Sequence, residues 1–272
     1  MIENICIHSY DIHVGSVAEI VQYCPRLQSL RVTFRITEDS LLALSKYCPL
    51  LKEVDSFCIP RISTPESAVL CAPALSCIHS ITTYIKHLEN FTYNYTLAIP
   101  YMTELRHVSA NGSIDHILLP IVSQYCLKVE SLEFQLASSA TPTEVLQLTR
   151  NCRNLRRITI YSVNLCVDEV VIELAQYCPN LEYLTLVSPK EVNTAITANS
   201  LLALSKHCLK LDTLNIIRCL QITEAGVLQF IHNSKHLNRL RLPLNCLSDD
   251  TVLSLPVTVS NNNDGMTLIF NT

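Results

Sequence analysis

The stretch Leu211–Ile231, LDTLNIIRCLQITEAGVLQFI, combines two hydrophobic periods in one short unit. Its first half follows the spacing LxxLxL over Leu211–Ile216 and ends in the two-residue alternation of a β-strand. Its second half has apolar residues at helical spacing over Val227–Ile231, and Thr223 is suited to cap the start of that helix. One short strand and one short helix cannot bury their own apolar faces, so this unit predicts stacking on copies of itself.

Copies of the unit recur through the sequence. Clear strand patterns begin at residues 2, 27, 51, 129, 155, 181, 211 and 237, and weaker ones begin at residues 75 and 102. The starts at 129, 155 and 181 are 26 residues apart, a spacing typical of strand-and-helix repeats. With a last strand at 266–270, the pattern predicts one domain over residues 1–272 with about ten repeats, of which those at 59–118 are irregular.

The helical halves repeat as well. Ser40–Cys48, SLLALSKYC, nearly matches Ser200–Cys208, SLLALSKHC, and both keep leucines on one helix face. Parallel strands joined by such helices predict the α/β class. The predicted architecture is a right-handed solenoid, or horseshoe, with a parallel sheet on the concave face and helices on the convex face.

Composition excludes several classes of protein. Hydrophobic residues make up 49% of the chain and charged residues 16%, which favours a large core over disorder. The four glycines are too few for a turn-rich all-β fold or a glycine-rich nucleotide loop. A net charge of −4 gives no electrostatic reason to expect nucleic acid or an anionic membrane as a partner.

The 13 cysteines recur with the repeat and do not form CxxC pairs, so most are predicted to be small buried apolar residues in a reducing compartment. The first residues, MIENICIHSYDIH, contain no signal-peptide pattern, and no run of 18 apolar residues occurs. We therefore expect a cytoplasmic protein, with the nucleus as a second location.

Two segments depart from the repeat. Residues 78–101 are rich in β-branched and aromatic residues, and either form a degenerate pair of repeats or a protruding loop that takes part in binding. The 30-residue spacing between the starts at 181 and 211 predicts an insertion at Ser188–Thr194, which would project from one rim of the solenoid.

The combination of LxxLxL, a cysteine or asparagine three residues later, Ile-Thr-Glu and a helix ending in Cys-Pro resembles the cysteine-containing subclass of leucine-rich repeats. The resemblance is strong at 24–58 and 126–246. It implies the repeat region of F-box/LRR proteins, in which an F-box binds the Skp–cullin ubiquitin ligase core and the repeats bind the substrate. No F-box-like stretch precedes the repeat pattern, which begins at Ile2.

No motif of known catalytic chemistry occurs. P-loop, GxGxxG, HExxH and GxSxG patterns are all missing from the sequence. The pairs Cys6/His8 and Cys77/His79 could each offer two metal ligands, but no second pair stands at zinc-site spacing. We therefore expect a protein that is not an enzyme and that needs neither a cofactor nor a metal.

The residues between the core leucines predict a binding surface. In LxxLxL the leucines face the core, so the intervening side chains line the concave face. The central position of successive strands reads Cys6, Arg31, Asp55, His79, Arg106, Glu133, Thr159, Thr185, Asn215 and Arg241. The candidate protein-binding residues are Arg31, Asp55, Arg106, Glu133, Arg157, Tyr161, Tyr183, Asn215, Arg239 and Arg241.

Arginine and tyrosine are the residue types that dominate protein–protein hot spots. The sequence therefore predicts a protein-interaction module that recognises substrates for a Skp–cullin–F-box (SCF) ubiquitin ligase. The alternative is a scaffold or inhibitor that binds a protein partner on the concave face without any link to ubiquitin. An extracellular recognition receptor is a third hypothesis, which would require paired cysteines.

Overall fold

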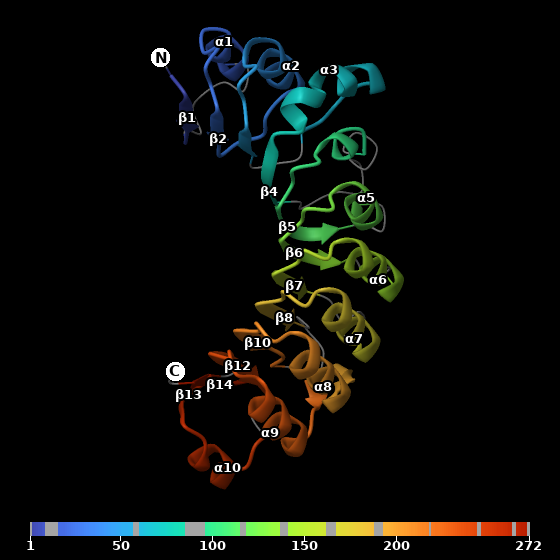
Figure 1. The fold of residues 1–272 in the computed structure, drawn as a ribbon, viewed down its shortest axis with the longest axis vertical. Coiled ribbons are helices and arrows are strands. Elements are labelled where there is room, and N and C mark those ends of the chain that lie inside the picture. Colours follow the sequence, from blue (N-terminus) through green and yellow to red (C-terminus); the bar gives the residue numbers. More distant parts are fainter. Residues whose placement is uncertain are drawn as a thin grey trace. The chain divides into compact units, whose positions relative to one another are not determined.

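The structure is a computed structural model that describes residues 2–8, 16–56, 60–84, 96–114, 118–136, 141–161, 167–187, 193–217, 219–243, 246–262 and 265–270. Its contacts divide the chain into two compact units, Met1–Ser131 and Leu132–Thr272. Both units alternate strands with helices, as the repeat predicts (Figure 1). The single domain over residues 1–272 stays a prediction.

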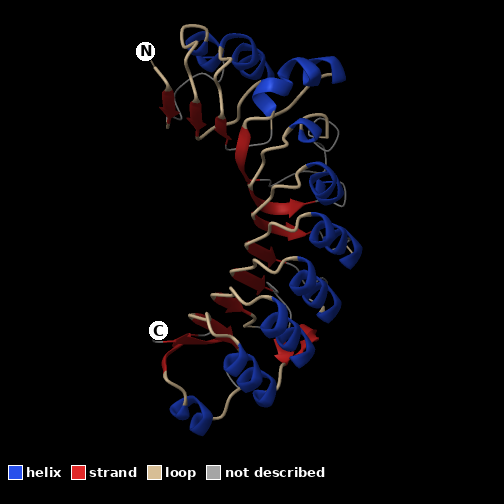
Figure 2. Ribbon diagram, viewed as in Figure 1, coloured by secondary structure: helices blue, strands red, loops and turns tan. Residues whose placement is uncertain are grey.

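In the first unit the described strands run parallel in the order β1-β2-β3-β4-β5. Its elements are β1 (Asn4–Ile7), α1 (Ser16–Val21), β2 (Ser29–Val32), α2 (Glu38–Tyr47), β3 (Glu53–Ser56), α3 (Pro65–Leu75), β4 (Ile78–Tyr84), the 3-10 helix η1 (Ile99–Tyr101), β5 (His107–Ile114) and α5 (Leu118–Tyr125). Figure 2 shows the helices of this unit together on one side of its strands.

The irregular repeats at 59–118 keep the strand-and-helix plan, with η1 in place of a full helix. The weak pattern that begins at Leu75 places Ile78 opposite Val54, as its spacing predicts, although Leu75 is still the last residue of α3. The weak pattern predicted to begin at residue 102 is wrong by three residues, because β5 begins at His107 and Leu105 is the buried residue two positions before it. Residues 85–95, the middle of the segment 78–101 that is the alternative binding loop, lie outside the described residues.

The second unit begins within β6 (Ser131–Leu136) and orders its main strands β6-β7-β8-β10-β12-β14-β13. Its further elements are α6 (Pro142–Asn151), β7 (Arg157–Tyr161), α7 (Asp168–Tyr177), β8 (Tyr183–Val187), β9 (Asn193–Thr197), α8 (Ala198–His207), β10 (Thr213–Asn215), β11 (Cys219–Gln221), α9 (Glu224–Asn233), β12 (Arg239–Leu242), α10 (Asp249–Ser254), β13 (Val257–Asn262) and β14 (Gly265–Phe270). Together the two units have the α/β leucine-rich-repeat fold that the sequence predicts.

Three features of the second unit correct the sequence-based expectations. The predicted insertion at Ser188–Thr194 includes the start of β9, which pairs in parallel with β11 in a separate small sheet. The partner strand β11 begins at Cys219, and the repeat pattern predicts no strand at this position. The last strand, β14, runs antiparallel to β12 and forms a hairpin with β13, so the sheet is not parallel throughout.

The LxxLxL residues form the core. Leu211, Leu214 and Ile216 are each at most 2% exposed, whereas Thr213 between them is half-buried. The helices pack their apolar faces against the strands, and in α9 the buried residues are Val227 and Phe230. Because strand side chains alternate, burying one set turns the intervening set toward the face of the sheet without helices.

One backbone carbonyl in each regular repeat holds the next repeat in register. The carbonyl of Gln28 accepts the N–H groups of both Lys52, at 2.8 Å, and Glu53, at 3.1 Å. The same double acceptance is made by the carbonyls of Glu3, Arg106, Arg156, Glu182 and Asp212. Glu3 follows the exposed Ile2, and each of the other residues follows a buried leucine, so the bond recurs with the sequence period.

The cysteines at the ends of α2, α7 and α8 join neighbouring repeats on the helical side. The Cys48 thiol points at the carbonyls of Val21 and Cys24, at 3.6 and 3.5 Å, which belong to the end of the preceding helix. Cys178 and Cys208 make the same pair of contacts with the repeats before them. A thiol is small enough for the core and still a weak donor, so it suits carbonyls that the helix leaves unsatisfied.

Carboxylates at helix starts join successive helices. In the first unit Glu38 of α2 accepts bonds from the backbone N–H and the hydroxyl of Ser63, both at 2.9 Å, just before α3. Asp168 of α7 accepts the N–H of Thr197, the N-cap of α8, at 2.8 Å. Burial acts most strongly on the pKa of Glu38 and would raise it, but the bonds from Ser67 and Ser63 outweigh burial and lower the pKa.

Within the described part of the chain, no helix has the length and apolar character needed to cross a membrane.

The close approach of α8 and α9 predicts the effect of one substitution. A Cβ added at Gly226 would lie 2.7 Å from the Cβ of Ala198, a rigid neighbour. Alanine normally stabilises a helix by about 1 kcal/mol over glycine, but overpacking costs about 1–3 kcal/mol. We expect Gly226→Ala to lower the free energy of unfolding by about 1–2 kcal/mol, measured by urea titration.

Ala198→Gly is the matched second substitution, because it removes the opposing Cβ. The double variant should be more stable than Gly226→Ala alone. A Gly226→Ala protein as stable as the wild type would show that the two helices do not approach this closely.

The buried thiols predict a loss of stability in alkali. Burial raises the pKa of Cys178 and of Cys208 from the ordinary value of 9.0 to about 12. A folded-state pKa above the unfolded value means that stability is full below about pH 9 and is lost as the pH rises toward the folded value. We expect the free energy of unfolding to fall from about pH 9 upward, measured by urea titration at each pH.

Lysine and tyrosine also titrate in this range, so Cys178→Ala provides the comparison. That variant starts less stable, because it loses buried contacts, but its stability should fall less steeply above pH 9 than that of the wild type. Equal slopes for the two proteins would contradict the assignment to the thiol.

Candidate functional site

The residues predicted to bind a partner lie on two open faces, one in each unit. The first open face is the helix-free side of β1 to β5, and the second open face is the helix-free side of β6 to β14. Arg31, Asp55 and Arg106 belong to the first unit. The second unit holds the other seven candidates, which are Glu133, Arg157, Tyr161, Tyr183, Asn215, Arg239 and Arg241.

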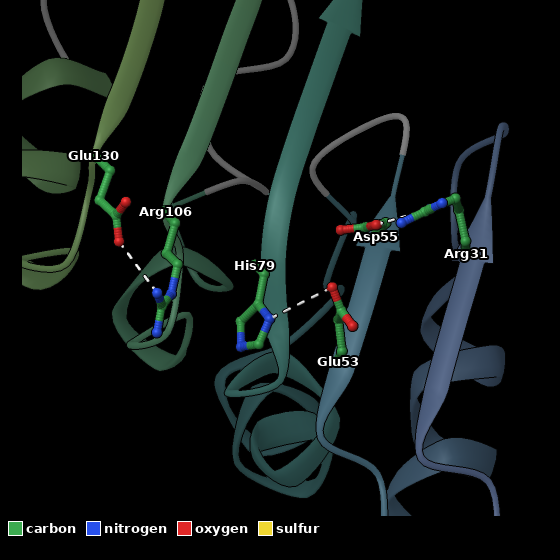
Figure 3. A network of polar contacts seen from close by, with 6 residues as sticks. All are labelled: Arg31, Glu53, Asp55, His79, Arg106 and Glu130. Carbon is green, nitrogen blue, oxygen red and sulfur yellow. Dashed lines mark hydrogen bonds and ion pairs between the residues drawn. The ribbon is translucent and has the colours of Figure 1, made fainter. Parts of the chain in front are cut away.

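On the first open face the predicted charges are paired with one another. Arg31 Nε donates to Asp55 Oδ2 at 2.9 Å across β2 and β3 (Figure 3). An Arg106 terminal guanidinium nitrogen lies 3.1 Å from Glu130 Oε1, and Figure 3 shows these two side chains pointing toward each other. The pair with Asp55 raises the pKa of Arg31, chiefly through the hydrogen bond.

The predicted central row breaks between β3 and β4. The sequence places His79 beside Asp55, but Asp55 pairs with Ser80 after a register shift that follows Val54. The cause lies in α3, because the N–H groups of Ser76 and Cys77 donate to Ala72 and Ala74 at its end and not to the preceding repeat. His79 instead lies 4.0 Å from Glu53.

On the second open face the predicted central row is confirmed. Thr159, Thr185, Asn215 and Arg241 are direct partners across β7, β8, β10 and β12. A second row, one step toward the strand starts, contains Arg157, Tyr183, Thr213 and Arg239. Side chains of one row share a face and are about 5 Å from their neighbours, so the arginines and tyrosines form one continuous surface.

Two contacts order the aromatic side chains of this surface. The Arg157 guanidinium lies over the Tyr183 ring, 4.2 Å from the ring centre. The Tyr161 hydroxyl donates to Glu133 Oε1 at 3.3 Å. Burial is the main cause that raises the pKa of Tyr161, and the nearby Glu133 carboxylate adds to it.

Asn215 and Ile217 depart from the expectation that both line the open face. Asn215 is 7% exposed and Ile217 is 9% exposed, so both are buried. β10 is only three residues long, and Ile216 donates its N–H to the Arg241 carbonyl at 2.9 Å as the chain leaves the strand. Asn215 Oδ1 is buried without a hydrogen-bond partner among the described residues.

The candidate metal ligands do not assemble into a site. Cys6 Sγ on β1 and His8 Nε2, one residue past that strand, are 2.9 Å apart. Cys77 turns away from His79 and contacts the carbonyls of Leu51 and Pro73, each at 3.3 Å. Across the residues that the structure covers, no group of three or more histidines, cysteines or acidic residues could hold a metal.

Sequence reasoning missed the ion pairs made one residue after the first core position of a repeat. Arg156 Nε donates to Glu182 at 3.0 Å. Arg106, predicted for the central row, is corrected to this position, because β5 begins only at His107, and it pairs with Glu130. Each of these residues follows the first core residue of a repeat, and the partners are 26 and 24 residues apart. A comparison of this repeat position between successive copies would have revealed the ion pairs, because the two copies carry opposite charges there.

The stacking of Arg157 on Tyr183 predicts a measurable coupling. An exposed cation–π contact contributes about 0.5–1 kcal/mol. We expect a double-mutant cycle with Arg157→Ala and Tyr183→Ala to give a coupling free energy of that size in urea unfolding. The cycle of Tyr183→Ala with Arg239→Ala is the control and should give less than about 0.5 kcal/mol, since the two residues are two strands apart.

Comparison with known proteins gives two informative sequence relatives. The chain is 24% identical over 242 residues to GRR1-like protein 1 of Arabidopsis thaliana, an alignment that covers 87% of this chain and 36% of that protein. It is 23% identical over 135 residues to F-box/LRR-repeat protein 4 of Bos taurus, covering 50% of this chain and 21% of that protein. The chain thus spans about a third or less of the length of these relatives. No protein-family model matches it.

A solved structure, the yeast complex of Rad7 and Elc1, matches with a TM-score of 0.48 and 16% identity over 90% of this chain and 75% of that one. The resemblance to the repeat region of F-box/LRR proteins, inferred from the sequence motifs, is confirmed by the two sequence relatives.

Proposed function

We propose that this chain is a protein-interaction module that recognises substrates for an SCF-type ubiquitin ligase. The observation that carries the interaction role is the second open face, where arginine and tyrosine side chains lie side by side on a rigid sheet. These residue types dominate binding hot spots, and the sheet holds them without further ordering.

The link to ubiquitin is supported by the relatives. One is named an F-box/LRR-repeat protein, and the motif resemblance implies the repeat region of the same family. The proposed assembly places the Skp–cullin core on a separate F-box and the substrate on the repeats. No catalytic step is proposed for this chain, and no cofactor is needed for recognition.

The alternative function is a scaffold or inhibitor that binds its partner without a ligase. The observation that favours it is the second open face itself, whose arginine and tyrosine side chains can bind a protein without any ligase component. The two functions share the same surface, so they differ only in whether Skp and cullin accompany the partner.

The proposed location is the cytoplasm or the nucleus. All the cysteines that the structure describes are free, and eight of them are buried. Such thiols fit a reducing compartment, and they do not support the extracellular receptor, which would need paired cysteines.

The test is affinity purification of the protein tagged at its own chromosomal locus, so that the F-box of the proposed assembly is present, followed by mass spectrometry. We expect a protein partner together with Skp and cullin. Changing Arg157 and Tyr183 to alanine should reduce recovery of the partner about tenfold or more, because hot-spot residues contribute about 2 kcal/mol each.

The control variant is Arg153→Ala, which removes an exposed arginine beside Tyr177 of α7, away from the strands. It should recover the partner as the wild type does. A partner recovered without Skp and cullin would favour the scaffold, and equal recovery by the open-face variant would overturn the proposed surface.

A further inference from the structure

Three arginines on the second open face differ from the other charged residues of the sheet. Arg157, Arg239 and Arg241 form no ion pair with any residue that the structure describes, whereas Arg31 and Arg106 on the first open face each have a carboxylate partner. The side chains of Arg157 and Arg239 are exposed and that of Arg241 is half-buried.

The carboxylates in the repeats that adjoin these arginines have other partners. Glu182 binds Arg156, and Asp212 accepts from the Asn238 amide and from the Thr213 hydroxyl. Glu133, the acid on the same face, accepts the Tyr161 hydroxyl. Arg156 neutralises Glu182, whereas Asp212 and Glu133 have neutral hydrogen-bond donors and keep their charge. Three arginines against two acids leave this face an excess of one positive charge in a chain whose net charge is −4.

We infer that the second open face binds an acidic peptide segment of the partner, with carboxylates or phosphates placed on these arginines. The inference rests on the proposed protein-binding function and adds the chemistry of the partner. Arginine suits this role because its planar guanidinium donates two parallel hydrogen bonds to a carboxylate or a phosphate.

The stacking on Tyr183 prepares Arg157 for such a ligand. The ring contact at 4.2 Å restricts the guanidinium while its N–H groups remain free at the edge of the plane. A side chain that is already ordered loses less conformational entropy on binding, so its contribution to affinity is larger.

The strand spacing sets the pattern of acids in the ligand. Arg157 and Arg239 occupy the same row on β7 and β12, which are separated by β8 and β10. Three strand spacings of about 4.8 Å place their backbones about 14 Å apart, which equals about four residues of extended chain. An extended segment lying across the strands would therefore present acidic groups four residues apart.

A nucleic acid is a weaker match for the same charges. Nucleic-acid surfaces are strongly basic, with many phosphate contacts, whereas this face has three unpaired arginines and the chain is acidic overall. Half-buried Thr159 and Thr185 lie between the arginines and offer hydroxyl groups to a peptide backbone.

Fluorescence polarisation with the full chain tests the inference. The probe is a labelled 12-residue peptide with glutamates four residues apart, and its matched control has the same composition with the glutamates adjacent at one end. A second pair of probes replaces the glutamates by phosphoserines, and a single-stranded DNA oligonucleotide of equal charge is included. We expect salt-sensitive binding of the spaced peptides, several-fold tighter than that of the clustered ones.

The triple variant Arg157→Ala, Arg239→Ala, Arg241→Ala should weaken binding at least tenfold. The first-face variant Arg31→Ala, Arg106→Ala removes nearly as much positive charge and should leave binding unchanged; circular dichroism confirms that both variants fold. Failure of all the peptides to bind, unchanged binding by the triple variant, or tighter binding of the DNA would overturn the inference. Tighter binding of the phosphoserine peptide would support it with phosphate as the anion.

Failure here and failure of the proposed function have different signatures. If the affinity-purified partner depends on Tyr183 but not on Arg239 and Arg241, the protein-binding function stands and the acidic ligand is wrong.

Discussion

The carbonyl that accepts two N–H groups from the following repeat is the interaction on which each unit depends. It recurs at Gln28, Arg106, Arg156, Glu182 and Asp212, always at one position of the repeat. A parallel pair without this bond could slip by one residue, and such a slip would exchange the buried and exposed side chains. The bond therefore keeps the leucines in the core and leaves the residues between them on the open face.

The helical side uses different groups for the same purpose. Cysteine thiols contact the carbonyl ends of preceding helices, and carboxylates such as Glu38 bind the amide starts of following ones. Each contact satisfies backbone groups that a helix end leaves unpaired, so neighbouring repeats complete one another. None of these contacts uses the open face, where arginines and tyrosines are free to vary with the partner.

Where the backbone follows the period, the sequence predicts both fold and surface rows. The strands β7 and β8 do so, and the predicted pairing of Thr159 with Thr185 is confirmed. The prediction of the surface row fails where local hydrogen bonds compete with the period. The N–H groups of Ser76 and Cys77 donate to carbonyls at the end of α3, and the strand register shifts after Val54. Asn215 is buried because its strand is only three residues long and the chain turns directly after it. The spacing of the leucines does not predict where a strand ends, so it does not predict this burial.

The central claim is that the fold and the second open face are separate, with stability supplied by the repeat positions and charge supplied by residues between them. The most direct test is urea unfolding of the variant in which Arg157, Arg239 and Arg241 are all alanine, compared with Leu214→Ala. The account predicts a change within about 1 kcal/mol for the arginine variant and a loss of about 2–5 kcal/mol for the fully buried leucine. An arginine variant destabilised as much as Leu214→Ala would contradict it, because the face would then be part of what holds the fold together.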